Sequence, residues 1–326
     1  MINIKLGVIP TRRDIFSKEE ALKYKELILQ KLATMNITFV DIEDANDEGL
    51  LFDDNDVDKV VDKMIKEKVD ALFFPHCNFG TEYLVAQVAK KMNLPILIWG
   101  PRDESPLGDG SRLRDSQCGL FATGKVLRRF RCKFTYLPMC RLEDQEFYEG
   151  IRRFLATVNI IKELKDLTIL QIATRPSGFW TMMVNEGELL EKFNIKIHPV
   201  TLAEVKDEMD AVEQNKKDEV IQVIDYLKKE TIIEISDEAL VKVAALKVAI
   251  KSIAKRYNCK AAAVQCWNAM QGVLGIFPCA ANALLTDEKF PVACETDIHG
   301  AITSIIAQAA SCLLYTSDAA DEGLGV

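Results

Sequence analysis

The run Asp70-Ala-Leu-Phe-Phe-Pro-His-Cys-Asn-Phe-Gly-Thr-Glu82 decides the fold class. Residues 71–74 are continuously apolar, which is typical of a strand in a parallel sheet that is covered on both faces. The polar residues that follow lead into a helix predicted over 81–92, and a further apolar strand is predicted at 95–99. A strand, a helix and another strand in this order indicate a βαβ unit.

The same alternation continues along the chain. A helix is predicted to open at Ser17, with Glu20 as its capping-box partner. Further strands are predicted at residues 5–9, 38–42, 167–173, 195–199, 261–267 and 291–294. Further helices are predicted at residues 111–129, 143–165, 181–192, 203–229, 237–258 and 298–310. We therefore predict an α/β protein made of two consecutive doubly wound, Rossmann-like parallel-sheet domains, residues 1–160 and 161–311.

Composition narrows the class of protein. The 326 residues are 48% hydrophobic and 28% charged, as in a globular protein, and the net charge of −8 disfavours a nucleic-acid partner. The densest basic stretch, residues 125–133, is predicted to be a helix end and at most a local anion site. We see no signal peptide and no apolar run as long as a membrane span, so we expect a cytoplasmic protein without a membrane partner. The nine cysteines form no CxxC pair and are expected to be reduced.

The stretch Pro291-Val-Ala-Cys-Glu-Thr-Asp-Ile-His-Gly300 carries the clearest chemical pattern. If the backbone is extended there, Glu295 and Asp297 point to the same side of the strand. Two carboxylates held together suit a hard cation or the movement of a proton next to a carbonyl. The alternative is that Asp297 caps the following helix and Glu295 is a solvated strand end.

Ligands of open α/β sheets bind beyond the carboxyl ends of the strands. The polar residues predicted at such ends, besides the acidic pair, are Arg12, Arg13, His76, Cys77, Asn78, Arg175 and Gln265. Their positions predict a binding site, but they specify no reaction.

The last residues differ in character from the helix before them. The run Cys312-Leu-Leu-Tyr-Thr-Ser-Asp-Ala-Ala-Asp-Glu322 resembles the translation of a transposase adaptor that is used in sequencing libraries. We expect residues 312–326 to be a non-native tail, and the chain to be a fragment of a longer protein. A genuine polar C-terminus is the alternative.

Several segments, taken together, resemble the L-fucose isomerase / L-arabinose isomerase superfamily. The similarity covers most of residues 1–311 and rests on the order and spacing of the segments rather than on one motif. The segments are residues 7–17, 70–82, 94–100, 167–179, 265–267, 275–279 and 293–301.

The resemblance implies an aldose–ketose isomerase that works through an enediol with a divalent metal, usually Mn²⁺. It implies Glu295 and Asp297 as catalytic residues and metal ligands, and a third, β-rich C-terminal domain that is missing here, so the fragment itself is expected to be inactive. It further implies a homo-oligomer whose active sites are shared between subunits, with a monosaccharide as substrate. The residues expected to contact that substrate are Arg12, Arg13, Cys77, Asn78, Gln265 and Trp267. Core packing is the alternative role for Trp267.

One departure from the family pattern bears on the metal. No carboxylate occurs between Asn258 and Asp287, and Gln265 stands where the family has an acid. A neutral amide binds a cation weakly, so Mn²⁺ binding is in question. Two other functions therefore stay open: a non-catalytic sugar-binding or regulatory protein, and a metal-independent carbohydrate epimerase. We expect His299 to be a structural histidine, and Cys266 and Cys294 to be small buried thiols.

Overall fold

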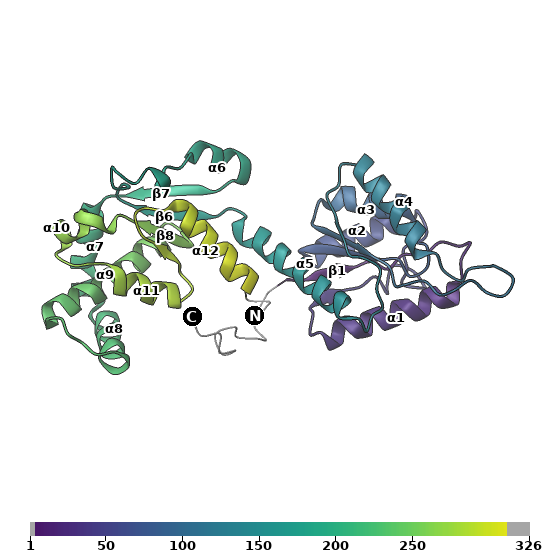
Figure 1. The fold of residues 1–326 in the computed structure, drawn as a ribbon, viewed down its shortest axis with the longest axis horizontal. Coiled ribbons are helices and arrows are strands. Elements are labelled where there is room, and N and C mark those ends of the chain that lie inside the picture. Colours follow the sequence, from purple (N-terminus) through teal and green to yellow (C-terminus); the bar gives the residue numbers. More distant parts are fainter. Residues whose placement is uncertain (1–3, 312–326) are drawn as a thin grey trace. The chain divides into compact units, whose positions relative to one another are not determined.

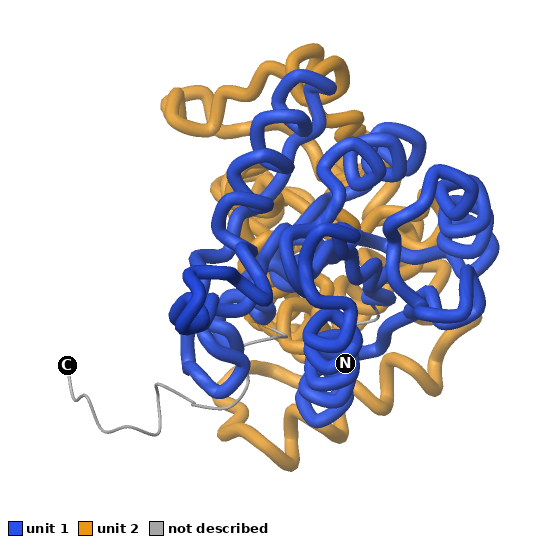
Figure 2. The backbone as a smooth tube through the Cα atoms, turned by 90° about the vertical axis from the view of Figure 1, so that its right-hand side faces the viewer, with its two compact units in different colours: residues 1–159, 312–326 blue, residues 160–311 orange. Residues whose placement is uncertain are grey.

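The computed structural model describes residues 4–311, and the tail predicted at 312–326 lies outside that range. The described chain divides into two compact units, one ending at Asn159 and the other spanning Ile160–Ser311, shown in blue and orange in Figure 2. Within residues 4–311 no single helix has the length and apolar composition to cross a membrane. One pair of helices, Cys266–Leu274 and Cys279–Asp287, passes that test only when joined across a bend of 108°.

The first unit contains a five-stranded parallel sheet in the order β2-β1-β3-β4-β5. The strands are β1 (Leu6–Val8), β2 (Phe39–Val40), β3 (Ala71–Pro75), β4 (Ile96–Trp99) and β5 (Thr135–Tyr136). The central strand β3 is buried along its whole length and is paired on both sides, with Phe73 opposite Val8 and Leu97. The strand predicted from the apolar run at residues 71–74 is therefore confirmed.

Helices cover both faces of this sheet (Figure 1). They are α1 (Lys18–Thr34), α2 (Asp56–Lys66), α3 (Glu82–Met92), α4 (Ser116–Arg129) and α5 (Gln145–Leu164). Phe73 packs in one core layer with residues of α1 and α5, and its neighbour Phe74 packs in the other with residues of α2, α3 and α4. Successive side chains of a strand point to opposite faces, so one short apolar run anchors both layers.

The second unit repeats this plan with four parallel strands in the order β7-β6-β8-β9. The strands are β6 (Thr168–Ile172), β7 (Lys196–Val200), β8 (Ala261–Val264) and β9 (Val292–Ala293). The helical segments are η1 (Trp180–Met182), α6 (Glu186–Phe193), α7 (Leu202–Asn215), α8 (Lys217–Glu230), α9 (Asp237–Arg256), η2 (Cys266–Met270), α10 (Gln271–Leu274), α11 (Cys279–Asp287) and α12 (Ile298–Ser311). Residues of α7, α8, α9 and α11 form one core layer, and those of α6 and α12 form the other.

Local signals account for most helix boundaries. Ser17 caps α1 as predicted, because its hydroxyl accepts a hydrogen bond from the Glu20 amide at 3.1 Å. The reciprocal bond of a capping box is replaced by another, since the Ser17 amide donates to the Leu113 carbonyl at 3.0 Å. The helix predicted over 203–229 is in fact two helices, because Lys216, at φ −127° and ψ 36°, interrupts the helical conformation.

The predicted fold class, two doubly wound α/β units, is confirmed. In each unit the strand order reverses beside the first strand, between β1 and β3 and between β6 and β8. A doubly wound sheet places its ligand crevice at such a switch point, beyond the carboxyl ends of the strands. The loops that leave these four strands are therefore where a site is expected.

Candidate functional site

The switch point of the first unit is closed by hydrogen bonds between its own loops. The Thr11 hydroxyl donates to the Leu51 carbonyl at 2.8 Å and accepts from the Thr81 amide at 3.0 Å. The Thr81 hydroxyl in turn donates to the Arg12 carbonyl at 2.6 Å. Thr11 and Thr81 are both buried, so the bonds that close this loop pair are shielded from water.

Asn78 and Cys77, which the sequence assigns to substrate contact, are fully buried in this loop pair. The Asn78 side-chain oxygen accepts from the Arg13 backbone amide at 2.9 Å, and the side-chain nitrogen donates to the backbone carbonyls of Arg13 and Ser17, each at 3.2 Å. Burial raises the pKa of the Cys77 thiol to about 12, so this thiol stays protonated. In this structure both side chains hold the loops together, and neither is exposed to a ligand.

Arg12 and Arg13 also have partners within the unit. Arg12 is 5% exposed, binds both carboxylate oxygens of Glu48 at 2.6 and 3.0 Å, and also pairs with Asp14. Its guanidinium lies 3.7 Å from the centre of the Phe52 ring. Arg13 pairs with Glu82. Their charges are thus compensated inside the unit, and contact with a sugar stays a prediction.

The switch point of the second unit is joined by fewer hydrogen bonds. The Gln265 side-chain oxygen accepts from the Thr174 amide at 3.3 Å, which links the loops after β8 and β6. The Thr296 amide donates to the Val264 carbonyl at 3.0 Å, which links the loop after β9 to the end of β8. These contacts bring Gln265 and the acidic stretch to the same edge of the sheet, as predicted from their positions at strand ends.

The acidic stretch is not an extended strand, so that expectation is wrong. β9 ends at Ala293, and Glu295 and Thr296 adopt left-handed φ values of 52° and 59°. The Asp297 carboxylate accepts from the Gly300 amide at 2.9 Å and caps α12, which was the alternative reading of this residue. Glu295 instead accepts a hydrogen bond from the Cys266 thiol at 3.2 Å. The two carboxylates therefore have different partners.

Cys266, Cys294 and Glu295 form a thiol–carboxylate cluster, in which one ligand atom of each residue lies within 4.8 Å of the others. Burial raises the pKa of Cys266 to about 12, so the thiol stays protonated and donates a hydrogen bond to Glu295. The Asn282 side-chain amide donates to the Cys294 sulfur at 3.6 Å. Cys294 directly follows β9 and Cys266 lies two residues after β8, so the strand-end rule that singled out Glu295 applies to both.

The cluster does not fit the Mn²⁺ that the resemblance implies. Mn²⁺ prefers oxygen ligands, whereas two of the three donors here are sulfur atoms. Asp297, the other expected ligand, bonds the α12 amide and stands outside the cluster. Two thiolates and a carboxylate suit a softer cation such as Zn²⁺.

A pocket of about 240 Å³ lies at the same strand ends. Its lining includes Thr174, Arg175, Glu186 and Thr296. The Arg175 guanidinium donates only to the carbonyls of Pro176 and Ser177, and no carboxylate within residues 4–311 pairs with it. A cation without an acidic partner in a polar pocket is available to an anionic ligand.

Several buried polar atoms around this edge also have no hydrogen-bond partner in the described chain. They are the Thr296 hydroxyl oxygen and the side-chain carbonyl oxygens of Gln271 and Asn282. Gln271 donates to the Cys266 carbonyl and Asn282 to the Cys294 sulfur, so these atoms lie around the cluster. Unpaired buried polar atoms cost free energy unless a bound molecule supplies the missing bonds.

Aromatic side chains stand at the surface beside these loops. Trp267 is 56% exposed and meets the Phe179 ring edge-on at 5.5 Å, so the alternative that it packs in the core is wrong. Trp180 is 76% exposed. His299 is exposed on α12 rather than a structural histidine. Exposed aromatic rings next to polar groups are a common surface for stacking on a ligand.

The fold and this edge define a class: a doubly wound α/β protein whose second unit carries a polar strand-end site. The family described as fucose/sulfoquinovose isomerase, N-terminal domain, matches residues 7–165. Sulfoquinovose isomerases of Priestia aryabhattai and Priestia megaterium are each 24% identical to the chain over 308 residues, 94% of this chain and 66% of theirs. One from Alkalicoccus urumqiensis is 25% identical over 239 residues, 73% of this chain and 52% of its own length.

The chain belongs to the fucose isomerase-like superfamily, as the resemblance of its segments predicted. It spans just under two thirds of the length of the Priestia relatives and about half of the Alkalicoccus relative. Among solved structures, a periplasmic solute-binding protein from Actinobacillus succinogenes with bound D-allose aligns with 96% of this chain at 12% identity. Its TM-score of 0.23 supports no conclusion about fold or ligand.

Proposed function

We propose that the full-length protein interconverts an aldose and a ketose, with Glu295 as the base. Superfamily membership supports the reaction class. The observation that carries the assignment of the base is the position of Glu295 at the strand-end edge, where the Cys266 thiol donates to one of its oxygens. Asp297, by contrast, is occupied as a helix cap.

In the proposed reaction the Glu295 carboxylate removes the proton from the carbon next to the carbonyl. The C–H bonding electrons form the C=C bond of the enediol, the carbonyl π electrons move onto its oxygen, and the proton of the neighbouring hydroxyl passes to that oxygen. The same carboxyl group then returns its proton to the former carbonyl carbon, and the neighbouring C–O becomes the new carbonyl. The neutral Cys266 thiol orients the carboxylate by its hydrogen bond. Because the donor set does not fit Mn²⁺, no step is assigned to that metal.

The proposed substrate is a monosaccharide, and the relatives make sulfoquinovose the first one to test. Arg175, which lines the pocket and has no acidic partner among the described residues, suits the sulfonate of such a sugar. In this proposal Gln265 bonds a hydroxyl group of the sugar, and Trp267, which is exposed, stacks on an apolar face of the ring.

The rest of the active site belongs, in this proposal, to the part of the relatives that this chain does not match. We therefore expect the 326-residue chain to have no turnover, as a fragment would, while the longer protein is active. A cytoplasmic homo-oligomer, in which the Arg12–Arg13 loop reaches the site of a neighbouring subunit, is part of the same proposal. Size-exclusion chromatography with light scattering on the longer protein tests the oligomer.

The experiment is a ketose-formation assay on the full-length protein with sulfoquinovose and with L-fucose, run beside solvent-deuterium exchange in D₂O. Glu295→Gln is expected to lower turnover about 10³-fold or more, because the amide cannot accept the proton. Asp297→Asn is the matched control, since asparagine caps a helix as well as aspartate does. Full turnover in folded Glu295→Gln protein would overturn the assignment of the base.

The absence of a carboxylate between Asn258 and Asp287 favours a second candidate, a non-catalytic sugar-binding or regulatory protein. Calorimetric binding of a sugar without deuterium exchange would support that function. Deuterium exchange that inverts a stereocentre without forming a ketose would instead support a metal-independent epimerase.

A further inference from the structure

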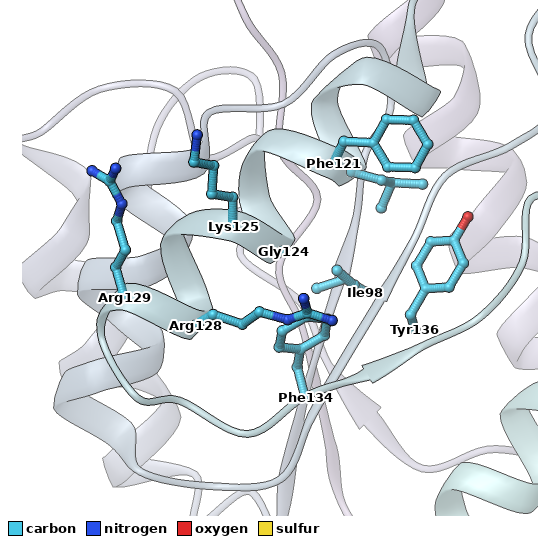
Figure 3. Close-up of a pocket in the computed structure, with 9 residues that line it drawn as sticks. Ile98, Phe121, Gly124, Lys125, Arg128, Arg129, Phe134 and Tyr136 are labelled. Atoms are coloured by element: carbon cyan, nitrogen blue, oxygen red, sulfur yellow. The ribbon is translucent and has the colours of Figure 1, made fainter.

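The first unit has a groove of about 610 Å³ between α4 and the edge strand β5, away from its switch point. Three aromatic rings line it, those of Phe121, Phe134 and Tyr136. Figure 3 shows Lys125 and Arg129 at one end of the view, Phe121 and Tyr136 at the other, and Arg128 and Phe134 between them. This volume is within the range of small-molecule sites, about 300–1,000 Å³.

The sequence builds this groove through the periodicity of α4. Leu120 and Leu127 face the core and are buried, which leaves Phe121 62% exposed on the groove side. Gly124 provides room, because a Cβ at this position would come within 3.3 Å of the Phe134 ring. β5 is paired only with β4, so Tyr136 lies at a free sheet edge and is 42% exposed. The apolar surface of the groove is thus left open within the unit.

Three cations line the same groove: Lys125, Arg128 and Arg129. None of them forms an ion pair or a side-chain hydrogen bond with a residue in the described chain, whereas Arg12, Arg13 and Arg114 each pair with a carboxylate. The dipole of α4 favours cations in its last turn, which accounts for Arg128 and Arg129. Lys125 lies a turn earlier, so the dipole does not account for the whole cluster. Three uncompensated cations in a chain of net charge −8 favour an anionic ligand.

We propose that this groove binds a small organic anion that joins a flat ring to a phosphate group, the chemistry of a nucleoside monophosphate. The ring stacks between Phe121 and Tyr136, and the phosphate binds Arg128 and Lys125. Aromatic side chains stack on any heterocyclic ring, and guanidinium groups bind phosphate through paired hydrogen bonds. The site uses no residue of the proposed isomerase site, so either proposal can fail without the other.

The test is isothermal titration calorimetry of the 326-residue chain with AMP, adenosine and inorganic phosphate. AMP is expected to bind with a Kd below about 1 mM, and adenosine and phosphate about tenfold or more weakly. Arg128→Gln and Tyr136→Ser are each expected to weaken AMP binding about tenfold. Arg112→Gln, an exposed arginine of the same unit outside the groove, is the matched control. A thermal scan of each variant checks that the unit still folds.

Three results would overturn the proposal. The first is no heat of AMP binding at 5 mM nucleotide, about fivefold above the expected limit. The second is equal affinity for AMP and inorganic phosphate with no effect of Tyr136→Ser, because the ring would then contribute nothing. The third is a concentration-dependent dimer that Tyr136→Asp abolishes, because the groove would then be covered by a second copy of the chain.

Discussion

The loops at the two switch points occupy equivalent places in one strand order but use their polar groups differently. In the first unit Thr11, Asn78 and Thr81 are buried and bonded to neighbouring backbone groups. In the second unit the Thr296 hydroxyl is buried without a partner among the described residues, and Trp267 is largely exposed. The first arrangement makes a rigid scaffold, and the second leaves bonding capacity for a ligand.

The comparison shows that topology alone does not make a site. The rule that ligands bind at the switch point of an open α/β sheet identifies both switch points equally well. What separates them is whether the chain itself satisfies the polar groups that gather there, as Asn78 does and Thr296 does not.

Gly119→Ala should break the closed loops of the first unit most severely. A Cβ at this position would lie 1.7 Å from the Phe79 carbonyl oxygen, so α4 could not dock on the loop. We expect the free energy of unfolding of this unit to fall by more than about 3 kcal/mol. Denaturant unfolding followed through the buried Trp99 measures it. Gly187→Ala, whose Cβ meets only the Asn185 side chain at 3.5 Å, is the control, and equal effects of the two changes would contradict the prediction.

The first unit should also lose stability in mild acid because of His76. This side chain is fully buried, and burial lowers its pKa from 6.5 to about 4. Its Nδ1 faces the Phe74 carbonyl, which can only accept, so Nδ1 carries the proton and Nε2 accepts from the Thr123 hydroxyl at 2.8 Å. Above pH 6.5 the His76 imidazole is neutral in both the folded and the unfolded state. Between pH 6.5 and 4 it gains a proton only in the unfolded state.

The free energy of unfolding should therefore fall as the pH falls through this range, in total by about 3 kcal/mol. Denaturant midpoints measured at intervals across the range test the slope. His76→Gln removes the titrating group and should flatten the profile, and an unchanged slope in that variant would assign the effect to other groups.

Asn78→Ala and Gln265→Ala compare the two switch points directly. Removing the Asn78 side chain takes the acceptor away from the backbone amides of Arg13, Phe79 and Gly80 and should cost about 2 kcal/mol. Removing Gln265 leaves the amide and the hydroxyl of Thr174, an exposed residue, and should cost less than about 1 kcal/mol. Chemical denaturation of both variants gives the two values, and a larger loss for Gln265→Ala would reverse the comparison.

The thiol–carboxylate cluster should prefer Zn²⁺ to Mn²⁺. We expect at least about tenfold tighter binding of Zn²⁺, or 1.4 kcal/mol, because two of its donors are sulfur. Competition against a chromogenic chelator measures both affinities in the reduced protein. Cys294→Ser should remove most of the difference, and Cys259→Ser, at a thiol outside the cluster, should not. Tighter Mn²⁺ binding would restore the metal that the family resemblance implies.

Much of the fold could be predicted from the sequence because burial leaves a direct pattern. The run at 71–74 gave β3, and Ser17 gave the start of α1. The strand predicted over 261–267 stops at Val264, where Cys266 begins an irregular turn that contains Asn268 at φ 61°. An apolar pattern does not record where a strand gives way to such a turn, and only tertiary contacts set that boundary.

The site was harder to predict for the same reason. Glu295 was predicted as a site residue because a carboxylate follows a strand, but its left-handed backbone lies beside a bond between distant segments, from the Thr296 amide to the Val264 carbonyl. Asn78 and Arg12 resemble ligand-binding residues in sequence. Their partners, Arg13 and Glu48, use up their bonding capacity, and a sequence does not show which polar side chains are already satisfied.

The tight contact between Gly119 and Phe79 has a mechanical consequence. Because Gly119 has no side chain, the backbone of α4 packs directly against the Phe79 backbone. A shift of α4 toward the loop therefore displaces the loop backbone. Helix and loop must travel as one body, and the Ser116 hydroxyl, which donates to the Asn78 carbonyl at 2.7 Å, reinforces the linkage. A displacement of α4 therefore also moves the loop at Asn78, and with it the loop at Arg13, whose backbone amide donates to the Asn78 side chain.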